Sequence, residues 1–300
     1  GSSAVFTVTI NKASSQTSLT FDKTTPQIYG TAITPTCSVI TGVGTAVLKI
    51  DGNIITSGNP LTLGVNTYSF NCSLDSTTNY TASSNTSSFV INKASPSTLM
   101  TITGTTPIIY PTTSDFSPSE TNTGDSGCSY SMDRSNGIYG VGTWTFNYST
   151  AGCTNYSAGS VTKDLVVNQN TTYVLGITKT SPITYGTSTN FAGTGCPAQL
   201  TCSLNISNAI YGAGVVYANY STAGNANYSS NSVVDSVTIN QASSSVGLTA
   251  TTPITYGTTT NFAGSNCPSG ATCSLNISNA VYPAGTISAN YSFAGNTNYT

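Results

Sequence analysis

Residues 143–149, TWTFNYS, alternate large apolar and polar side chains with a period of two. Trp144, Phe146 and Tyr148 fall on one face, and the intervening Thr and Asn residues fall on the other. Successive side chains of a β-strand point to opposite faces of a sheet, so this pattern predicts a strand with one buried face. The same columns recur elsewhere in the chain, as Tyr68, Phe70 and Cys72 upstream and as Ile287, Ala289 and Tyr291 downstream.

This strand belongs to a unit that recurs four times. Each unit opens with Pro-x-x-Tyr, at residues 26–29, 107–110, 182–185 and 253–256. Most units close with an apolar residue followed by Asn, and successive closing Asn residues lie 81, 76 and 72 positions apart. Periods of this size indicate an array of small domains in which each unit packs mainly on its neighbours. We expect repeats at 13–93, 94–169, 170–241 and 242–300, preceded by a separate strand at 1–12.

The two ends of the sequence are in phase with each other. Tyr80 precedes Ile91 by 11 residues, and Tyr299 precedes Ile10 by the same 11 if the chain is read through Thr300 into Gly1. The chain is therefore expected to begin with the last strand of one repeat and to stop before the last strand of another. No initiator Met or apolar leader is present, and we expect any such segment to lie outside these 300 residues or to have been removed.

The composition excludes several classes of protein. Ser and Thr make up 98 of the 300 residues, only 16 residues are charged, and no charge follows Asp235. A net charge of −2 with seven basic residues gives no electrostatic footprint for nucleic acid or anionic lipid. The chain has no His, which excludes Ser-His-Asp and Cys-His catalysis, and we expect no enzyme activity, no cofactor and no metal site. No apolar run is long enough to predict a membrane span.

The fold class follows from the strands and the turns between them. Clusters of Gly, Asn, Ser and Pro separate the alternating segments, and Asp51-Gly52-Asn53 is a strong hairpin signal. No segment has the period of a helix. We predict an all-β chain of four small antiparallel β-sandwiches with about seven strands each. The last sandwich is expected to be completed by a strand from a neighbouring unit.

Three closing segments resemble a known family. FNYSTAGCTNYSA (146–158), ANYSTAGNANYSS (218–230) and ANYSFAGNTNYT (289–300) are similar to the closing segment of prokaryotic Ig-like surface repeats. In that family a strand ending in Tyr is followed by a turn of small residues and then by Asn-Tyr. The resemblance implies an Ig-like sandwich and an extracellular stalk, adhesin or fibre module at the cell surface.

The eight cysteines fall two to a repeat. Eight cysteines allow 105 pairings, so the sequence alone does not give the connectivity. Pairing within repeats is the simplest assignment, and one bridge per repeat would strengthen a sandwich with a modest core. Metal ligation is the alternative, although the chain has neither His nor a close CxxC pair. The expected bridges are Cys37–Cys72, Cys128–Cys153, Cys196–Cys202 and Cys267–Cys273.

Twelve Asn-x-Ser/Thr sequons make the chain a candidate glycoprotein. Their number is weak support, because 29 Asn residues in a chain one-third Ser and Thr give about nine or ten by chance. Their placement is stronger, because eight lie in two columns present in every repeat. Sugars on the outward face would keep an almost uncharged array soluble and block edge pairing. The sequons are Asn71, Asn79, Asn85, Asn147, Asn155, Asn170, Asn205, Asn219, Asn227, Asn276, Asn290 and Asn298.

Two further groups of residues each have two interpretations. The opening tyrosines are strand-edge packing residues or sugar-stacking platforms. The carboxylates of repeat two belong to a solvated loop or to a weak calcium site without EF-hand spacing. These groups are Tyr29, Tyr110, Tyr185 and Tyr256, and Asp115, Glu120, Asp125 and Asp133.

The function favoured by the sequence is structural. We expect an extracellular, glycosylated filament or stalk whose units join head to tail through Ala4, Phe6, Val8 and Ile10, with copies of the same chain as partners. Two mechanisms fit: separate subunits exchange this strand, or the 300 residues are one period of a giant tandem protein. The alternative function is a cell-surface adhesin whose loops or tyrosines bind a glycan or a protein.

Overall fold

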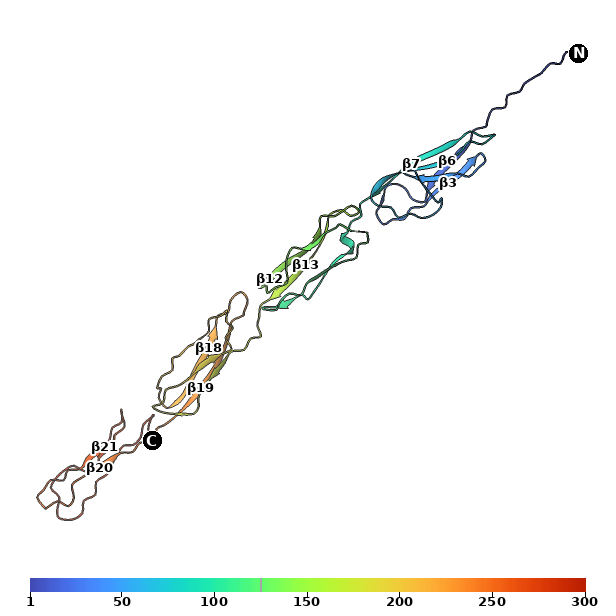
Figure 1. Ribbon diagram of the computed structural model, residues 1–300. Coiled ribbons are helices and arrows are strands. Elements are labelled where there is room, and N and C mark those ends of the chain that lie inside the picture. The colour runs from blue at the N-terminus through green and yellow to red at the C-terminus, as the bar shows by residue number, and fades with distance from the viewer. Residues whose placement is uncertain (125) are drawn as a thin grey trace. The chain divides into compact units, whose positions relative to one another are not determined.

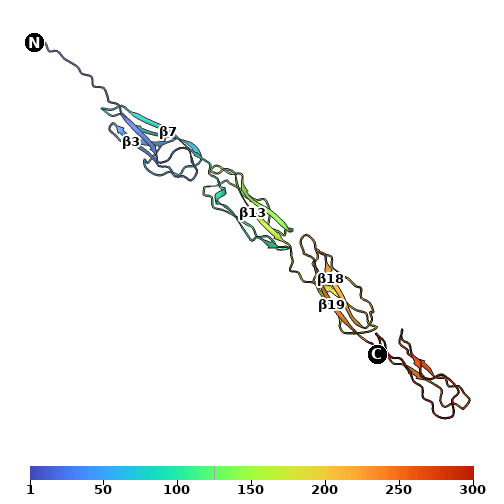
Figure 2. The same cartoon turned by 180° about the vertical axis from the view of Figure 1, so that it is seen from behind.

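The computed structural model of the protein describes residues 1–124 and 126–300 and is built from β-strands with a single short 3-10 turn (Figures 1 and 2). The predicted all-β fold is confirmed. The chain separates into two compact units. The first comprises Gly1–Ile108 and Thr112–Val167, and the second comprises Ile109–Pro111 and Asn168–Thr300.

Repeat one is a two-layer sandwich. A five-stranded sheet with the order β2-β7-β6-β4-β5 faces a two-stranded sheet of β1 and β3. Ile33, Leu48, Phe70, Phe89 and Ile91 form the core between the layers. The strands are β1 (Gln16–Phe21), β2 (Gln27–Ile28), β3 (Pro35–Thr41), β4 (Val47–Ile50), β5 (Asn53–Ile55), β6 (Asn66–Leu74) and β7 (Ser83–Asn92).

A long hairpin of the last two strands organises this sandwich. β6 and β7 pair antiparallel over nine residues, from Asn66 opposite Ile91 to Leu74 opposite Ser83. Along β7, Phe89 and Ile91 are buried and the residues on either side of each are not. The final strand therefore supplies two alternate side chains to the core, as the period of two predicts.

The short opening strand departs from the expected antiparallel pairing. β2 runs parallel to the end of β7, with Gln27 opposite Ile91 and Ile28 opposite Asn92. The Tyr29 N–H then donates to the Asn92 carbonyl oxygen at 2.9 Å. The long ladders of the sandwiches are antiparallel, as predicted, and this short edge pair is a parallel addition that the sequence did not indicate. β2 lies beside the end of β7 and runs in the same direction, so the two strands pair in parallel.

The predicted hairpin at residues 51–53 is present. β4 leads into β5, and Ile50 lies opposite Asn53. Asp51 and Gly52 have φ angles of 47° and 85°. Two successive left-handed residues are what a two-residue turn of this type requires, which explains the Asp-Gly sequence.

Repeat two keeps the same central hairpin, and over its described residues the larger sheet has four strands where repeat one has five. β12 and β13 pair over nine residues, and Leu165 and Val167 of β13 are buried. The larger sheet has the order β11-β12-β13-β9, and β8 pairs with β10. The elements are η1 (Ser97–Leu99), β8 (Met100–Thr103), β9 (Ile108–Ile109), β10 (Ser117–Glu120), β11 (Tyr130–Met132), β12 (Gly142–Thr150) and β13 (Gly159–Asn168).

Repeat three repeats this plan with a smaller core. Phe191, Ala218, Val237 and Ile239 are its buried members, the last two from the final strand β19. The sheet order is β15-β19-β18-β17, β14 pairs with β16, and β18 and β19 lie side by side in both views (Figures 1 and 2). The strands are β14 (Gly176–Thr178), β15 (Ile183–Thr184), β16 (Ala192–Thr194), β17 (Ser203–Leu204), β18 (Gly214–Thr222) and β19 (Asn231–Asn240).

Repeat four is the exception. Its strands form two isolated pairs, and the buried hydrophobic residues of the described chain end at Ile239. Among the described residues, repeat one has the expected seven strands, repeats two and three have six each, and repeat four has four. Residues 242–300 include no counterpart of the final strand, along which the penultimate and opening strands pair in repeats one and three. The strands are β20 (Gly247–Thr249), β21 (Ala263–Ser265), β22 (Ser274–Leu275) and β23 (Tyr291–Ser292).

Four disulfides join cysteines within the repeats, the pairing favoured by the sequence. Cys37 of β3 bonds to Cys72 of β6, so this bridge links the two sheets of repeat one. Two others close loops between cysteines only six positions apart. Each bridge restricts the unfolded chain, by an amount that grows with loop length in the chain-entropy account. The remaining bridges are Cys128–Cys153, Cys196–Cys202 and Cys267–Cys273.

The core position of the final strand gives a testable prediction. Leu165→Ala removes a side chain that is 0% exposed, and we expect it to lower the unfolding free energy of repeat two by about 2–5 kcal/mol. Val166→Ala is the matched control, because Val166 is the next residue on the same strand and is 37% exposed. Calorimetric unfolding of the full chain measures both. Equal losses for the two variants would contradict the role assigned to the inward column.

Candidate interaction surfaces

The N-terminal segment carries apolar side chains that nothing covers. Phe6, Val8 and Ile10 are 90%, 71% and 90% exposed. Among the described residues, no strand pairs with residues 1–12, and Figure 1 shows this segment as a trace without a neighbouring strand. The chain joins repeat one only at Ala13, which forms a parallel bridge with Tyr80. An uncovered alternating strand is a template for pairing with another chain.

Repeat four has sheet edges that no strand covers in the described chain. In repeat three, β18 pairs with β19 along its whole length, and Ala218 is 0% exposed. The corresponding residues 285–293 contain only the two-residue strand β23, and Ala289 is half-buried. Ile254, at the place of a β15 residue, is 40% exposed and is not part of a strand. Both edges that a final strand would cover are therefore open.

The N-terminal segment matches the final strands in sequence phase. Counted back from the Asn that follows each strand, Val8 and Ile10 stand where repeat three has Val237 and Ile239. Those two residues are 0% and 3% exposed. The segment thus carries apolar residues at the two positions that a final strand buries.

A pair of tyrosines recurs where consecutive repeats meet. Within the first compact unit, the opening Tyr29 of repeat one packs edge-to-face on Tyr156 of repeat two, with ring centroids 5.5 Å apart. Within the second, Tyr185 packs on Tyr299 at 5.3 Å. Tyr110 also belongs to the second unit and packs on Tyr228 at 5.4 Å. Edge-to-face packing is a favoured geometry for aromatic rings.

An asparagine accompanies these tyrosines. The residue before Tyr156 is Asn155, whose Oδ1 accepts the N–H of Val65 at 3.2 Å. The residue before Tyr299 is Asn298, whose Oδ1 accepts the N–H of Ala213 at 2.8 Å. Each Asn-Tyr dipeptide therefore holds the preceding repeat by one hydrogen bond and one ring contact.

Sequence reasoning assigned the opening tyrosines to strand-edge packing or sugar stacking and missed this contact. The available signal was that each repeat carries both an opening Tyr and a closing Asn-Tyr. Sequence spacing places these features at opposite ends of a repeat, so nothing in one repeat indicated that they meet across a junction.

The sequons divide by exposure. Within the column expected to face outward, Asn71, Asn147 and Asn219 are half-buried, and their Oδ1 atoms are shielded from solvent without a hydrogen-bond partner. Asn290 is exposed. The alternation indicates that this column points away from the core, but it does not indicate that three of its side-chain oxygens are shielded from solvent. The exposed sequons are Asn79, Asn85, Asn205, Asn276 and Asn290, and the half-buried ones are Asn71, Asn147, Asn155, Asn170, Asn219, Asn227 and Asn298.

The carboxylates of repeat two form separate contacts. The Asp115 Oδ1 accepts the Thr105 N–H at 2.7 Å, and Glu120 Oε2 accepts the Asn122 N–H at 2.8 Å. Asp125 lies outside the described residues, and across the remainder of the chain no three Asp, Glu, Cys or His residues gather as a metal cluster.

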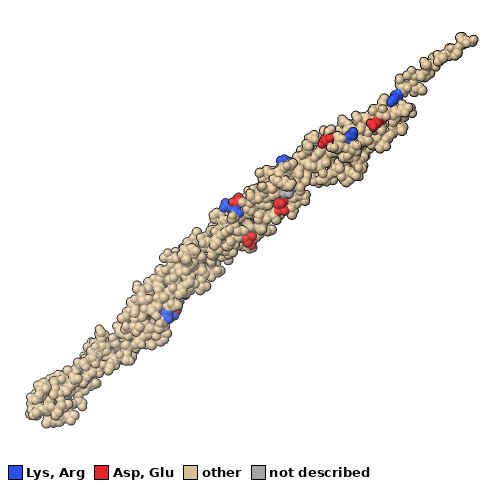
Figure 3. All heavy atoms as spheres, viewed as in Figure 1, with Lys and Arg blue, Asp and Glu red and all other residues tan. Residues whose placement is uncertain are grey.

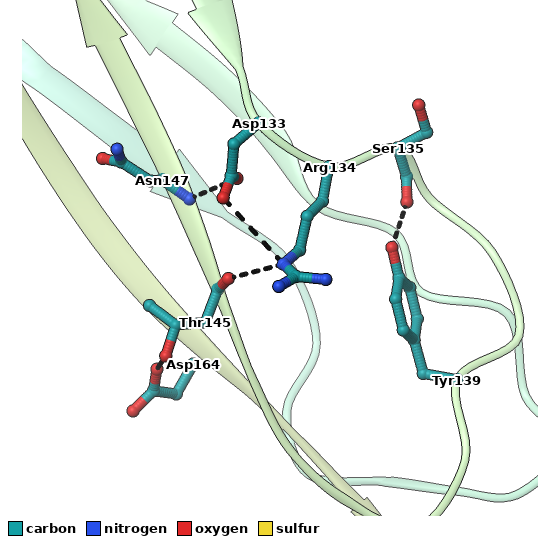
Figure 4. A network of polar contacts seen from close by, with 7 residues as sticks. All are labelled: Asp133, Arg134, Ser135, Tyr139, Thr145, Asn147 and Asp164. Atoms are coloured by element: carbon teal, nitrogen blue, oxygen red, sulfur yellow. Dashed lines mark hydrogen bonds and ion pairs between the residues drawn. The ribbon is translucent and has the colours of Figure 1, made fainter.

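Asp133 belongs to a polar network on the surface of repeat two (Figure 4). Its Oδ1 accepts the backbone N–H of Asn147 at 2.7 Å, and Arg134 Nε lies 3.9 Å from its other oxygen and donates to the Thr145 carbonyl oxygen at 3.0 Å. Thr145 Oγ1 in turn donates to Asp164 at 2.6 Å. These contacts fix the loop after β11 to the central hairpin, which is a structural role.

Charge is scarce on the surface and missing from repeat four. Figure 3 shows isolated charged side chains and none over the part of the chain that follows Asp235. Two carboxyl groups have a lowered pKa. Hydrogen bonds from the backbone and hydroxyl of Thr105 lower the pKa of Asp115. A hydrogen bond from Lys179, aided by the Ser236 N–H, lowers the pKa of Asp235.

A hollow on repeat four is lined by Tyr256, Val281, Tyr282, Pro283 and Ala284. Tyr256 is 75% exposed, in contrast to the half-buried opening tyrosines of the other repeats. Among the described helices, none has the length and apolar character of a membrane span.

No protein-family model matches this sequence, and neither does any curated protein. A solved structure of Drosophila N-cadherin EC1-4 is similar at 8% identity over 72% of this chain and 71% of that chain, with a TM-score of 0.23. This likeness is too weak to support an argument, so the tandem β-sandwich fold rests on the strand pairing and burial described above.

Acid should weaken repeat three through Asp235. Because its folded pKa lies below the ordinary value of 3.8, the Lys179–Asp235 contact stabilises above about pH 4 and is lost as the pH falls through the folded pKa. We expect Asp235→Asn to lower the unfolding temperature at pH 7, and the gap to wild type to shrink below pH 4. Lys179→Gln should behave alike, and a gap that is constant with pH would contradict the assignment.

Proposed function

We propose that the protein is a structural subunit, or one period, of an extracellular filament or stalk, in which Ala4–Ile10 completes repeat four of a neighbouring unit. The observation that carries this proposal is that the chain has both an unpaired apolar strand and a repeat without a final strand. One copy presents Val8 and Ile10 uncovered, and repeat four lacks the strand that buries those two positions elsewhere. Donation of the strand to the open sheet edge would bury its apolar side chains and pair the backbone groups of that edge.

The register of the joint follows from repeat three. There Ile239 lies opposite Gly214 and Val237 opposite Val216. The equivalent pairs place Ile10 opposite Gly285 and Val8 opposite Ile287. The parallel pair of Ile183 with Ile239 likewise places Ile254 beside Ile10. The donated strand would then cover both open edges of repeat four.

Hydrophobic burial is the main driving force available to this joint. Covering a Val or Ile side chain contributes about 1.5–3 kcal/mol each, in addition to the ladder of backbone hydrogen bonds that shields the edge. Residues 1–11 have no charged side chain and no charge follows Asp235. Assembly should therefore depend little on salt, unlike an interface formed by ion pairs.

The two mechanisms of joining remain alternatives, namely strand exchange between separate subunits and a continuous tandem chain. Boiling in detergent with reductant distinguishes them. Strand exchange predicts a band at the mass of one subunit plus any sugar, because only non-covalent contacts are lost. A continuous chain predicts material too large to enter the gel.

Assembly should require the inward column of the donated strand. We expect Val8→Asp with Ile10→Asp to abolish fibres, because two carboxylates would have to enter an apolar core. The matched control is Val5→Asp with Thr9→Asp, whose counterparts in repeat three are Val234, 61% exposed, and the exposed Thr238. Electron microscopy and light scattering measure both variants.

Fibres that persist in the first variant would contradict strand donation. A wild-type protein that stays monomeric in solution would contradict the filament and leave the adhesin hypothesis.

We infer that the protein functions outside the cell. Four disulfides are typical of an oxidising compartment, and the closing segments resemble prokaryotic Ig-like surface repeats. The array has few charges to prevent side-by-side association, and N-linked sugars would supply that protection. We assign them to the exposed sequons away from the repeat junctions and from the edge that the donated strand would cover, which are Asn85, Asn205 and Asn276.

Glycosylation should follow exposure. We expect peptides of the native protein that contain Asn205 and Asn276 to carry sugar, and those with Asn71 to carry less, because that side chain is half-buried next to a disulfide. Mass spectrometry before and after enzymatic release of glycans measures this occupancy. Unmodified Asn205 and Asn276 would contradict the assignment.

A further inference from the structure

The internal junctions have a fixed connection between one repeat and the next. In the first compact unit, the Tyr29 N–H donates to the Asn92 carbonyl oxygen at 2.9 Å. Two residues later, Ala94 forms a parallel bridge with Tyr156, the ring on which Tyr29 packs. A single residue, Lys93, thus separates Asn92, at the end of one sandwich, from Ala94, which pairs with the tyrosine of the next repeat.

The junction between repeats three and four has the same construction. The Tyr185 N–H donates to the Asn240 carbonyl oxygen at 2.9 Å, and Ala242 bridges Tyr299. The Ala242 N–H donates to the Asn298 carbonyl oxygen at 2.9 Å. The geometry is therefore a repeated feature of these junctions and not a property of one pair of repeats.

Repeat one carries the Asn-Tyr dipeptide of such a junction, but no opening tyrosine packs on it in the described chain. Asn11-Lys12-Ala13 has the spacing of Asn92-Lys93-Ala94, and the Ala13 N–H donates to the Asn79 carbonyl oxygen at 2.8 Å. Asn79 and Tyr80 stand where repeat two has Asn155 and Tyr156. Over residues 1–124 and 126–300, no aromatic ring packs on Tyr80.

Repeat four carries the opening tyrosine of such a junction. Tyr256 is the opening tyrosine, is 75% exposed, and has no ring against it in the described chain. It lines the hollow together with Ala284. Ala284 occupies the same position in repeat four as Ala213 does in repeat three. The Ala284 N–H is therefore the counterpart of the Ala213 N–H, which donates to the Asn298 Oδ1.

We infer that Asn79-Tyr80 of one copy docks in the hollow of repeat four of the preceding copy, with Tyr80 edge-to-face on Tyr256 and the Asn79 Oδ1 accepting the Ala284 N–H. The inference rests on the proposed filament and names a second contact in the same joint. The donated strand ends at Asn11, and Ala13 is already fixed to Tyr80. Strand donation and tyrosine docking are therefore linked by one intervening residue, Lys12, and occur together.

The docking has a consequence that strand donation alone does not have. A strand inserted into a sheet holds the neighbour through its first 11 residues but does not orient repeat one. The tyrosine pair and the asparagine hydrogen bond add two contacts outside the strand, so the joint between copies would be oriented as the internal junctions are.

Oxidative coupling of tyrosines tests the docking, because packed Tyr side chains form dityrosine and Phe does not. Photo-oxidation of assembled wild-type protein should give a dityrosine peptide that joins Tyr80 to Tyr256, identified by mass spectrometry. Tyr80→Phe subunits alone and Tyr256→Phe subunits alone should lack this product. A mixture of the two variants should give cross-linked dimers and no longer species, because each dimer needs Tyr256 from one copy and Tyr80 from the other.

Tyr256→Ala supplies a second readout. We expect it to reduce the association constant of subunits by about tenfold or more, whereas Tyr256→Phe keeps the ring and should assemble nearly as wild type does. Fibres that form without the Tyr80–Tyr256 product, and that tolerate Tyr256→Ala, would overturn the docking and leave strand donation standing. If no variant and no wild-type sample assembles, the proposed filament itself is wrong.

Discussion

The insertion of two alternate apolar side chains from the final strand is the interaction on which each sandwich depends. Phe89 and Ile91 fill this role in repeat one, and Val237 and Ile239 fill it in repeat three. The same strand pairs antiparallel with the penultimate strand and parallel with the opening strand, so it joins both ends of a repeat. Where residues 1–300 provide no such strand, in repeat four, the long ladder and the buried core are both missing.

This dependence connects stability to assembly. A sandwich that can be finished only from outside has a built-in reason to bind another strand, since burial of apolar surface is the main favourable term in both folding and association. The uncharged character of the donated strand and of repeat four suits this role, because no ionised group must be taken out of water when they join. Some of the few charges fix loops to strands, as the Asp133 network does in repeat two.

The junctions between repeats show how a small contact gains significance by repetition. One edge-to-face tyrosine pair contributes only about 0.5–1.5 kcal/mol beyond the surface that it buries. The pair recurs with ring separations between 5.3 and 5.5 Å, and the asparagine hydrogen bond accompanies it at two junctions. Within each compact unit, such a pair lies where one repeat meets the next, so the same small contact is used more than once along the chain.

The sequence by itself determined the all-β class, the four repeats and the inward column of each strand, because a period of two and a recurring motif are local properties. It also indicated the apolar N-terminal strand and the Asp-Gly turn. Tertiary structure decided what depends on residues far apart in the chain. The parallel opening strand and the contact of Tyr29 with Tyr156 bring together segments that no local pattern relates. The shielding of the side-chain oxygens of Asn71, Asn147 and Asn219 from solvent is likewise a property of the folded chain. Side-chain alternation shows which way a residue points, whereas only the packed neighbours show what it meets there.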